Sequence, residues 1–246
     1  MRIGYIKYIN LDERADRAAH MDQVCSSLGI SFGRFSAIAP SVESLVRPEG
    51  KFNSYYVRAV PRVKQYLKNR KTMPRGVGIF GCFISHHMVL KSLDPDRVSL
   101  IMEDDVSVSP RAIEVIEQYM SSHLNGVDWD ILRVMWRNSY RWMPIKHCLS
   151  IKYSNDLLTF RYPHKELKDA KPFRRHNIFG GTHFYLVNGK KLEEISQYLE
   201  AENVTAMDAV FSTNKINVFL LPKRLYQDAD VKEESFGTDI PKLQLD

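Results

Sequence analysis

Residues 98–106 read Val-Ser-Leu-Ile-Met-Glu-Asp-Asp-Val, an apolar run that ends in three consecutive carboxylates, Glu103, Asp104 and Asp105. A nearly continuous apolar run is typical of a strand buried on both faces, as in the parallel sheets of α/β proteins. Ligands of such proteins bind beyond the carboxyl ends of the strands. Mg²⁺ and Mn²⁺ prefer oxygen ligands and would offset the repulsion between the carboxylates. A strand that runs into an acidic surface turn shows the same pattern, so the stretch alone leaves both interpretations open.

The segments on either side alternate between strand and helix patterns. Residues 3–11 predict a strand, Asp12 is positioned to cap the helix that follows, and Gly29 ends that helix. Residues 30–38 predict a second strand and complete a βαβ opening. The remaining pattern predicts three helices, over 76–93, from Ser109-Pro110 to Asn125-Gly126, and over 190–200. It predicts strands over 129–135, 182–187 and 216–221. An antiparallel pair of strands is predicted over 149–162, with a turn at Asn155-Asp156. This order predicts an α/β fold with extra antiparallel elements in the second half.

The bulk properties are those of a globular protein. The 246 residues suffice for one large core, or for two small lobes around a shared sheet. No apolar stretch approaches the roughly 20 residues that span a bilayer, and Met1-Arg2 leads into the first strand without a secretory signal pattern. The three cysteines, Cys25, Cys82 and Cys148, have no Cys-x-x-Cys spacing and are expected to be reduced, mostly buried thiols of a cytoplasmic protein.

The net charge of +6 is unevenly distributed. Residues 51–93 contain no Asp or Glu, whereas nine cations fall there: Lys51, Arg58, Arg62, Lys64, Lys68, Arg70, Lys71, Arg75 and Lys91. Such a block favours an anionic partner, namely phosphate groups, a nucleic acid or an acidic membrane surface. A solvated helix face is the alternative, but such faces normally mix both signs of charge. Four prolines interrupt residues 40–75, which predicts an irregular insertion or flap there.

Four segments carry a family resemblance. They are Tyr-Ile-Asn-Leu-Asp-x-Arg-x-Asp-Arg (8–17), Gly-Ile-Phe-Gly-Cys-Phe-Ile-Ser-His (78–86), Ile-Met-Glu-Asp-Asp-Val (101–106) and Gly-Gly-Thr-His-Phe-Tyr-Leu-Val (180–187). In this order they resemble glycosyltransferase family 25, the bacterial lipooligosaccharide galactosyltransferases and animal procollagen galactosyltransferases. The resemblance covers about residues 5–235, with 45–75 and 140–178 as poorly matched insertions.

The resemblance implies a single GT-A-like domain with a mixed sheet. Residues 1–125 would form a Rossmann-type nucleotide-sugar-binding half, with a basic insertion at about 45–75, and residues 126–235 the acceptor-side half, followed by a tail over 236–246. It also implies a UDP-sugar donor, usually UDP-galactose, a Mn²⁺ or Mg²⁺ ion, and transfer with inversion. One departure concerns Ala37-Ile38-Ala39-Pro40, where the family usually has an Ala-x-Asp-Gly turn, so the donor base and sugar are less defined.

The acidic motif supplies the predicted metal ligands. Glu103 and Asp105 lie two apart on an extended backbone, so their side chains can leave the same face. Asp105 would coordinate the ion, while Glu103 could reach the ion, a metal-bound water or the donor ribose. Asp104 would point the other way, at the donor site or as the anchor of the turn.

Further donor-site residues are expected at two other segments. Asn10, Asp12, Arg14 and Arg17 stand where the first strand ends and a helix begins, a position that favours phosphate, although solvated arginines would fit equally well. Ser85 and His86 lie in an apolar helix beside the metal strand, where a core histidine is the simpler alternative. Gln227, Asp228 and Asp230 follow the last strand and could complete the metal site or the diphosphate site, although a solvated loop is the alternative, which is favoured for Asp230.

An inverting transfer needs a general base for the acceptor hydroxyl, usually Asp or Glu. The family carries an acid at the position of Asp208, in Thr-Ala-Met-Asp-Ala-Val, although its usual proline is missing here. Asp128 and Asp130 are rival candidates, and Asp130 could instead close a strand.

The leading hypothesis is a cytoplasmic glycosyltransferase that extends a lipopolysaccharide, lipooligosaccharide or other surface-glycan acceptor at the inner face of a membrane. The basic segment 51–91 would then meet anionic lipid or phosphorylated sugars. A metal-dependent phosphoryl-transfer enzyme is an alternative, but no phosphate-cradling Gly-rich Lys-Ser/Thr loop is evident. A basic module that binds nucleic acid or membrane is another, but no zinc-finger spacing or stacking module supports nucleic acid.

Overall fold

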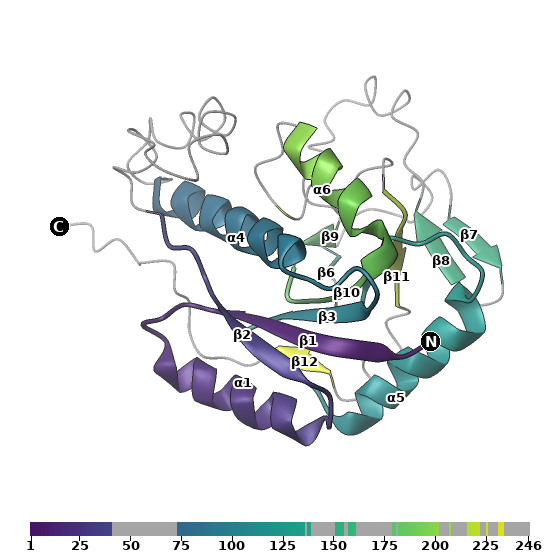
Figure 1. Ribbon diagram of the computed structural model, residues 1–246, viewed down its shortest axis with the longest axis horizontal. Coiled ribbons are helices and arrows are strands. Elements are labelled where there is room, and N and C mark those ends of the chain that lie inside the picture. Colours follow the sequence, from purple (N-terminus) through teal and green to yellow (C-terminus); the bar gives the residue numbers. More distant parts are fainter. Residues whose placement is uncertain are drawn as a thin grey trace.

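The computed structural model describes residues 1–40, 73–135, 137–138, 151–154, 157–160, 179–180, 182–201, 207, 216–221, 225 and 231–233. Within these residues eight strands form one sheet in the order β2-β1-β3-β10-β5-β11-β8-β7 (Figure 1). These strands are β1 (Ile3–Asn10), β2 (Phe32–Ser36), β3 (Val98–Glu103), β5 (Ile131–Arg133), β7 (Ile151–Ser154), β8 (Leu157–Phe160), β10 (Phe184–Asn188) and β11 (Val218–Leu220). Two small sheets pair β4 (Val106–Ser107) with β12 (Lys232–Glu233) and β6 (Arg137–Asn138) with β9 (Phe179–Gly180).

The sheet is mixed, with a parallel first half. β1 pairs in parallel with both β2 and β3, and the register places Asn10 opposite Ser36 and Ile9 opposite Glu103. The carboxyl ends of these three strands therefore meet at one edge. β10 is antiparallel to β3 and to β5, while β7 and β8 form an antiparallel pair. The predicted α/β class, the βαβ opening and the antiparallel second half are confirmed.

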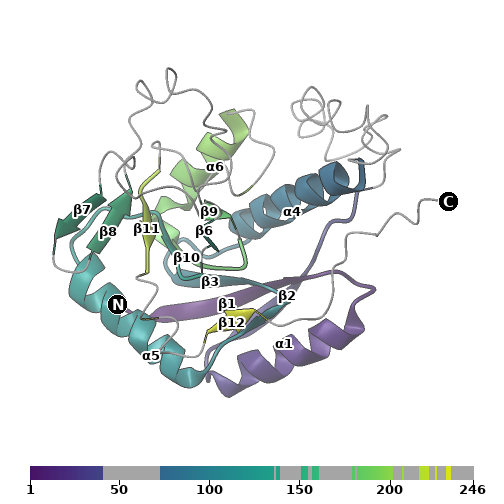
Figure 2. The same ribbon diagram turned by 180° about the vertical axis from the view of Figure 1, so that it is seen from behind.

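Helices cover both faces of the sheet. α4 (Met73–Lys91) and α6 (Leu192–Ala201) lie on one face, and α1 (Ala15–Ser27) and α5 (Pro110–Tyr119) lie on the other, as seen from both sides in Figures 1 and 2. A π-helical turn (Met120–Leu124) extends α5, and a 3-10 turn (Gly189–Lys191) precedes α6. None of the described helices is both long and apolar enough to cross a bilayer.

The two faces of the sheet carry separate cores. Along β3, Leu100 and Met102 pack in the core on the α1 and α5 side, whereas Ile101 packs in the core on the α4 and α6 side. Successive side chains of a strand point to opposite faces. This alternation sends Glu103 toward α4 and Asp104 toward α1.

The structure confirms most of the residues predicted to begin or end the first helices and corrects one of them. Gly29, with a φ of 67°, follows α1, and the Ser109 side chain caps α5 by accepting a 3.2 Å hydrogen bond from the Ala112 amide. Asp12, however, does not cap α1: the cap position is Arg14, and no side chain bonds there. Asp12 instead binds Arg34 and Ser36 of the neighbouring strand, since an ion pair across the parallel pair competes with the cap.

Two further outcomes concern element lengths. α4 begins at Met73, inside the stretch that the prolines predict to be irregular. The predicted strands over 129–135, 182–187 and 216–221 are shorter than expected, at Ile131–Arg133, Phe184–Asn188 and Val218–Leu220. Residues 41–72 of the predicted insertion or flap over 40–75 lie outside the described residues.

Candidate functional site

The acidic motif forms a compact cluster at the carboxyl end of β3. His183, which precedes β10, places its Nδ1 atom 3.3 Å from Glu103 Oε2 and 3.2 Å from Asp105 Oδ1. One ligand atom from each of the three side chains lies within 4.8 Å of the others. The backbone fixes this arrangement, because the Glu103 amide donates a 2.8 Å hydrogen bond to the His183 carbonyl.

The electrostatics of this cluster resemble those of a cation site. Burial would raise the pKa of Glu103, but the charge and hydrogen bonding of His183, with a smaller contribution from His86, hold it well below its usual range. Burial likewise opposes protonation of His183, but the carboxylates of Glu103 and Asp105 raise its pKa to about 11. The His183 imidazolium therefore supplies the positive charge that the two carboxylates require.

The residues of the cluster fit a divalent ion. Two carboxylates and one imidazole provide two anionic oxygens and a nitrogen, a set compatible with Mn²⁺ or Mg²⁺ once His183 has released its proton. The side chains of Glu103, Asp105 and His183 remain 24%, 19% and 18% exposed, so positions for substrate oxygens stay open. His183 is absent from the sequence prediction, although it stands in the fourth family segment, because only the pairing of β10 with β3 brings it to the acidic motif.

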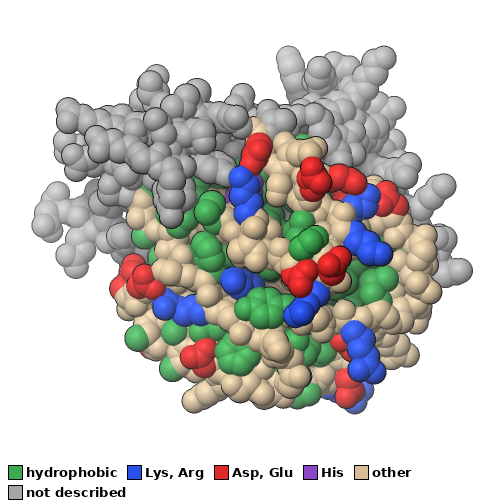
Figure 3. Space-filling view, in the orientation of Figure 1, with side chains coloured by type: hydrophobic (Ala, Val, Ile, Leu, Met, Phe, Trp, Pro, Cys, Tyr) green, Lys and Arg blue, Asp and Glu red, His purple; other side chains and the backbone are tan. Residues whose placement is uncertain are grey.

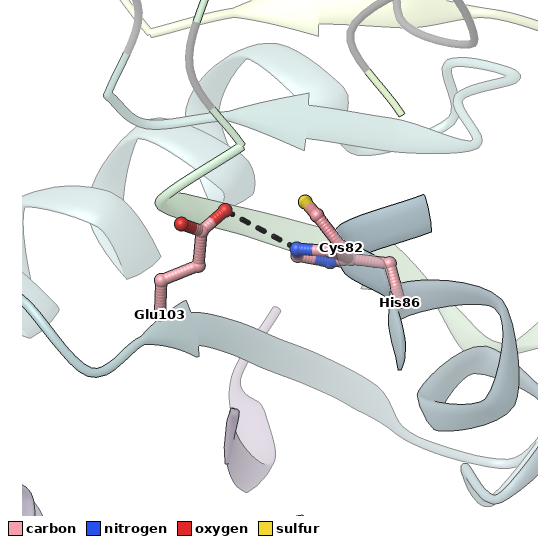
Figure 4. Close-up of side chains that lie close together, drawn as sticks. All are labelled: Cys82, His86 and Glu103. Carbon is pink, nitrogen blue, oxygen red and sulfur yellow. Dashed lines mark hydrogen bonds and ion pairs between the residues drawn. The ribbon is translucent and has the colours of Figure 1, made fainter. Parts of the chain in front are cut away.

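A second group of side chains holds Glu103 from the α4 side (Figure 4). His86 Nε2 lies 3.2 Å from Glu103 Oε1, and His86 Nδ1 lies 2.8 Å from the Tyr185 hydroxyl. The Thr182 hydroxyl donates to the same oxygen, Oε1 of Glu103, and lies 3.7 Å from Cys82 Sγ. The structure therefore brings His86 to the acidic motif, as expected, and adds Thr182, Tyr185 and Cys82 to it.

Asp104 faces the opposite side of the sheet, as the alternation of side chains predicts. Its carboxylate accepts 2.8 Å hydrogen bonds from Arg17 Nη1 and from Asn10 Nδ2. Burial raises the pKa of Asp104 although Arg17 and Asn10 favour its charged form. All three residues are buried, so this network ties the acidic turn to β1 and α1 from behind the cluster.

The remaining residues at the start of α1 are more exposed. Arg14 binds Asp16 of its own helix at 2.8 Å, and Asp12 binds Arg34 at 2.5 Å. Arg34 also donates a 2.8 Å hydrogen bond from Nε to Asn10 Oδ1. Arg14 and Asp12 therefore lie at the edge of the sheet where β1 ends, whereas Arg17 is buried in an ion pair rather than solvated.

Ser85 is committed to contacts within the protein. Its hydroxyl accepts a 2.8 Å hydrogen bond from the Ile38 amide and donates at 2.7 Å to the Gly81 carbonyl. A Cβ atom at Gly81 would stand 2.6 Å from the Ile38 carbonyl oxygen, so α4 packs against the segment after β2 at a glycine. These contacts fix the position of α4, and thereby that of His86.

The Arg17–Asp104 pair should contribute strongly to stability. Replacing Arg17 by methionine would leave a buried carboxylate without its cation, and we expect the free energy of unfolding to fall by about 3 kcal/mol. Urea unfolding would measure this. The matched control is Arg14→Met, which breaks the more exposed pair with Asp16 and should cost far less, because solvent screens this pair. Equal losses in the two variants would contradict a structural role for the buried pair.

Asp128 and Asp130 lie at the other end of the sheet. The Asp130 carbonyl accepts a hydrogen bond from the Asn188 amide, and Asn188 stands opposite Val98, where β3 begins. The Asp130 side chain is buried and accepts a 2.7 Å hydrogen bond from the Asn217 amide, so it closes a strand end. Asp208, Gln227, Asp228 and Asp230 lie outside the described residues.

The charge of the basic stretch is visible only in part. Lys91, its last cation, pairs with Glu200 of α6, while residues 41–72 lie outside the part that the structure describes. On the described surface of the face shown in Figure 3, acidic and basic side chains are interspersed. The predicted anionic partner of residues 51–91 therefore stays a prediction.

Comparisons with known proteins identify the family. The model of glycosyltransferase family 25 (LPS biosynthesis protein) matches residues 5–211. Two solved structures are similar to this chain: an active-site mutant of LgtC, with 12% sequence identity, and the galactosyltransferase LgtC in complex with donor and acceptor sugar analogs, with 13% identity. Each match covers 88% of this chain and 72% of the LgtC chain, with a TM-score of 0.41. The comparison with curated proteins gives no match. Because the family match spans most of the chain, this protein belongs to glycosyltransferase family 25 and is a glycosyltransferase.

Proposed function

We propose that this enzyme transfers galactose from UDP-galactose to a lipooligosaccharide, LPS or other surface glycan, with inversion and with a Mn²⁺ or Mg²⁺ ion at Glu103, Asp105 and His183. The observation that carries the proposal is the convergence of these three side chains, which lie within 4.8 Å of one another at the carboxyl end of β3. The parallel strands β1, β2 and β3 end at this edge, which is where α/β sheets bind their ligands.

Cleavage of the bond between sugar and nucleotide leaves negative charge on the departing diphosphate. A divalent ion, when bound, supplies the countercharge and a template for both phosphates. Glu103 and Asp105 provide anionic oxygens for it, and His183 provides a nitrogen. His86, 3.2 Å away, and the Thr182 hydroxyl both contact Glu103 Oε1 and hold this side chain in place, so the site is preorganised rather than assembled on binding.

The other contacts of the donor extend this proposal. Asp12 and Arg14 lie at the same sheet edge, where Arg14 can turn from Asp16 toward a phosphate, and Gln227 would complete the diphosphate contacts. Asp208 is the proposed general base. The cations of residues 51–91 would hold the enzyme at the cytoplasmic face of a membrane, next to its glycolipid acceptor.

A donor screen tests the proposed reaction. Hydrolysis of a panel of nucleotide sugars is measured with Mn²⁺, with Mg²⁺ and with excess chelator, because hydrolysis reports the donor without the acceptor being known. We expect UDP-galactose to be hydrolysed fastest and only when an ion is present. A different preferred sugar would correct the donor, and an undiminished rate in chelator would exclude the metal-dependent mechanism.

A further inference from the structure

We propose that Cys82, His86 and Glu103 form a second cation site, specific for a thiophilic divalent ion such as Zn²⁺. The three side chains offer a sulfur, a nitrogen and an oxygen atom that all lie within 4.8 Å of one another. This group differs from the cluster of Glu103, Asp105 and His183, and Glu103, which lies between them, is the one residue that the two groups share.

The site is built on regular secondary structure. Cys82 and His86 stand four residues apart on α4, so they leave the same face of the helix, and Glu103 ends the strand that this face covers (Figure 4). The 3.2 Å between His86 Nε2 and Glu103 Oε1 is close to the separation of two ligands of one tetrahedral Zn²⁺, about 3.3 Å for bonds of about 2.0 Å. The spacing of these two atoms therefore needs little change, whereas the Thr182 hydroxyl must give up its hydrogen bond to Oε1 when an ion binds.

Tyr185 orients the histidine. Its hydroxyl lies 2.8 Å from His86 Nδ1, and both side chains are buried. A histidine that binds a metal through Nε2 carries its proton on Nδ1 and donates it to an outer partner. The Tyr185 oxygen is placed to accept this hydrogen bond from Nδ1–H, which directs the lone pair of Nε2 toward Glu103 and Cys82.

The ligand types decide between ions. A thiolate sulfur favours Zn²⁺ or Co²⁺ over Mg²⁺ and Mn²⁺, which prefer oxygen. The thiol proton of Cys82 is released to solvent as the sulfur–metal bond forms, so the Cys82 thiolate and the Glu103 carboxylate together balance the two charges of the ion. With three protein ligands, a fourth position stays open for water.

Because Glu103 belongs to both groups, an ion at this site would withdraw it from Asp105 and His183. We therefore expect Zn²⁺ to lower the rate of glycosyl transfer that Mn²⁺ supports, an expectation that rests on the proposed function. The site itself does not depend on that function, so it is tested by binding alone.

The test uses Co²⁺ as a spectroscopic probe of the full-length protein. We expect a near-ultraviolet absorption band from thiolate-to-cobalt charge transfer, displaced by one equivalent of Zn²⁺. Cys82→Ser should remove the band and weaken Zn²⁺ binding by more than about 100-fold, since a lost ligand costs more than a lost outer partner. Cys25→Ala, which alters a buried thiol in the other core, should retain the band.

Tyr185→Phe keeps the packing of the core and removes only the hydroxyl. It should weaken Zn²⁺ binding by roughly 10- to 100-fold without abolishing the band. A band that survives Cys82→Ser would overturn the proposal, because the thiolate would then come from another cysteine. Zn²⁺ binding that is lost in Asp105→Asn but unchanged in Cys82→Ser would overturn it as well, because the ion would then occupy the Glu103, Asp105 and His183 cluster. If the wild-type enzyme shows no metal-dependent hydrolysis of the donor, the proposed function is contradicted. The cobalt spectra would still decide the Cys82, His86 and Glu103 site, because they do not depend on that activity.

Discussion

Replacing Asp105 by asparagine is expected to reduce glycosyl transfer by about 10³-fold or more, with the fold intact. Asparagine has the size of aspartate but no charge, so one of the two anionic oxygens of the cluster is lost. Asp105 lies in the turn after β3, and its contact with His183, at 3.2 Å, belongs to the cluster rather than to a core. The expected loss is therefore mainly one of ion binding and catalysis, because Glu103 still pairs with His183 in the variant.

The transfer rate and the Mn²⁺ affinity should be measured on one preparation, with unfolding by urea as the check on folding. Asp94→Asn is the matched control, because Asp94 is an exposed acid that precedes the other end of β3 and pairs with Arg97. We expect the control to match the wild-type enzyme. Full turnover by folded Asp105→Asn, or by the wild-type enzyme in excess chelator, would exclude metal-dependent transfer at this cluster.

The position of the acidic turn could be predicted because its signals are local. The apolar run over Val98–Glu103 identifies a buried strand, and the two-residue period of a strand separates Glu103 from Asp104 without any knowledge of the partners. The same local chemistry places Gly29 after α1 and Ser109 at the start of α5. Patterns of this kind depend on a few neighbouring residues, which the sequence contains in full.

The partners of the turn could not be predicted, because they come from distant parts of the chain. His183 reaches Asp105 across 78 positions, and Arg17 reaches Asp104 across 87. The fate of Asp12 shows the same limit: its local context favours a helix cap, but Arg34 and Ser36 on the adjacent strand bind it instead. Only the pairing of strands decides between such competitors.

The second large effect is expected for Asp208→Asn, which should lower the transfer rate by roughly 10²- to 10⁴-fold while leaving donor affinity nearly unchanged. The substitution keeps size and hydrogen bonding but removes the basicity needed to accept the proton of the acceptor hydroxyl. The assignment rests on the family resemblance, since the family carries an acid at this position. Asp208 itself lies outside the described residues.

The two rival acids lie at the far end of the sheet from the acidic cluster, since Asp130 closes a strand at the opposite end of β10 and Asp128 pairs with Lys191 there. UDP affinity and transfer rate measured on Asp208→Asn, with Asp208→Glu as the variant that retains a carboxylate, separate the possible roles. A base requires that the glutamate variant keep part of the activity that the asparagine variant loses. Loss of UDP affinity in both variants would instead make Asp208 a donor-binding residue, and a near-normal rate in Asp208→Asn would remove it from the reaction.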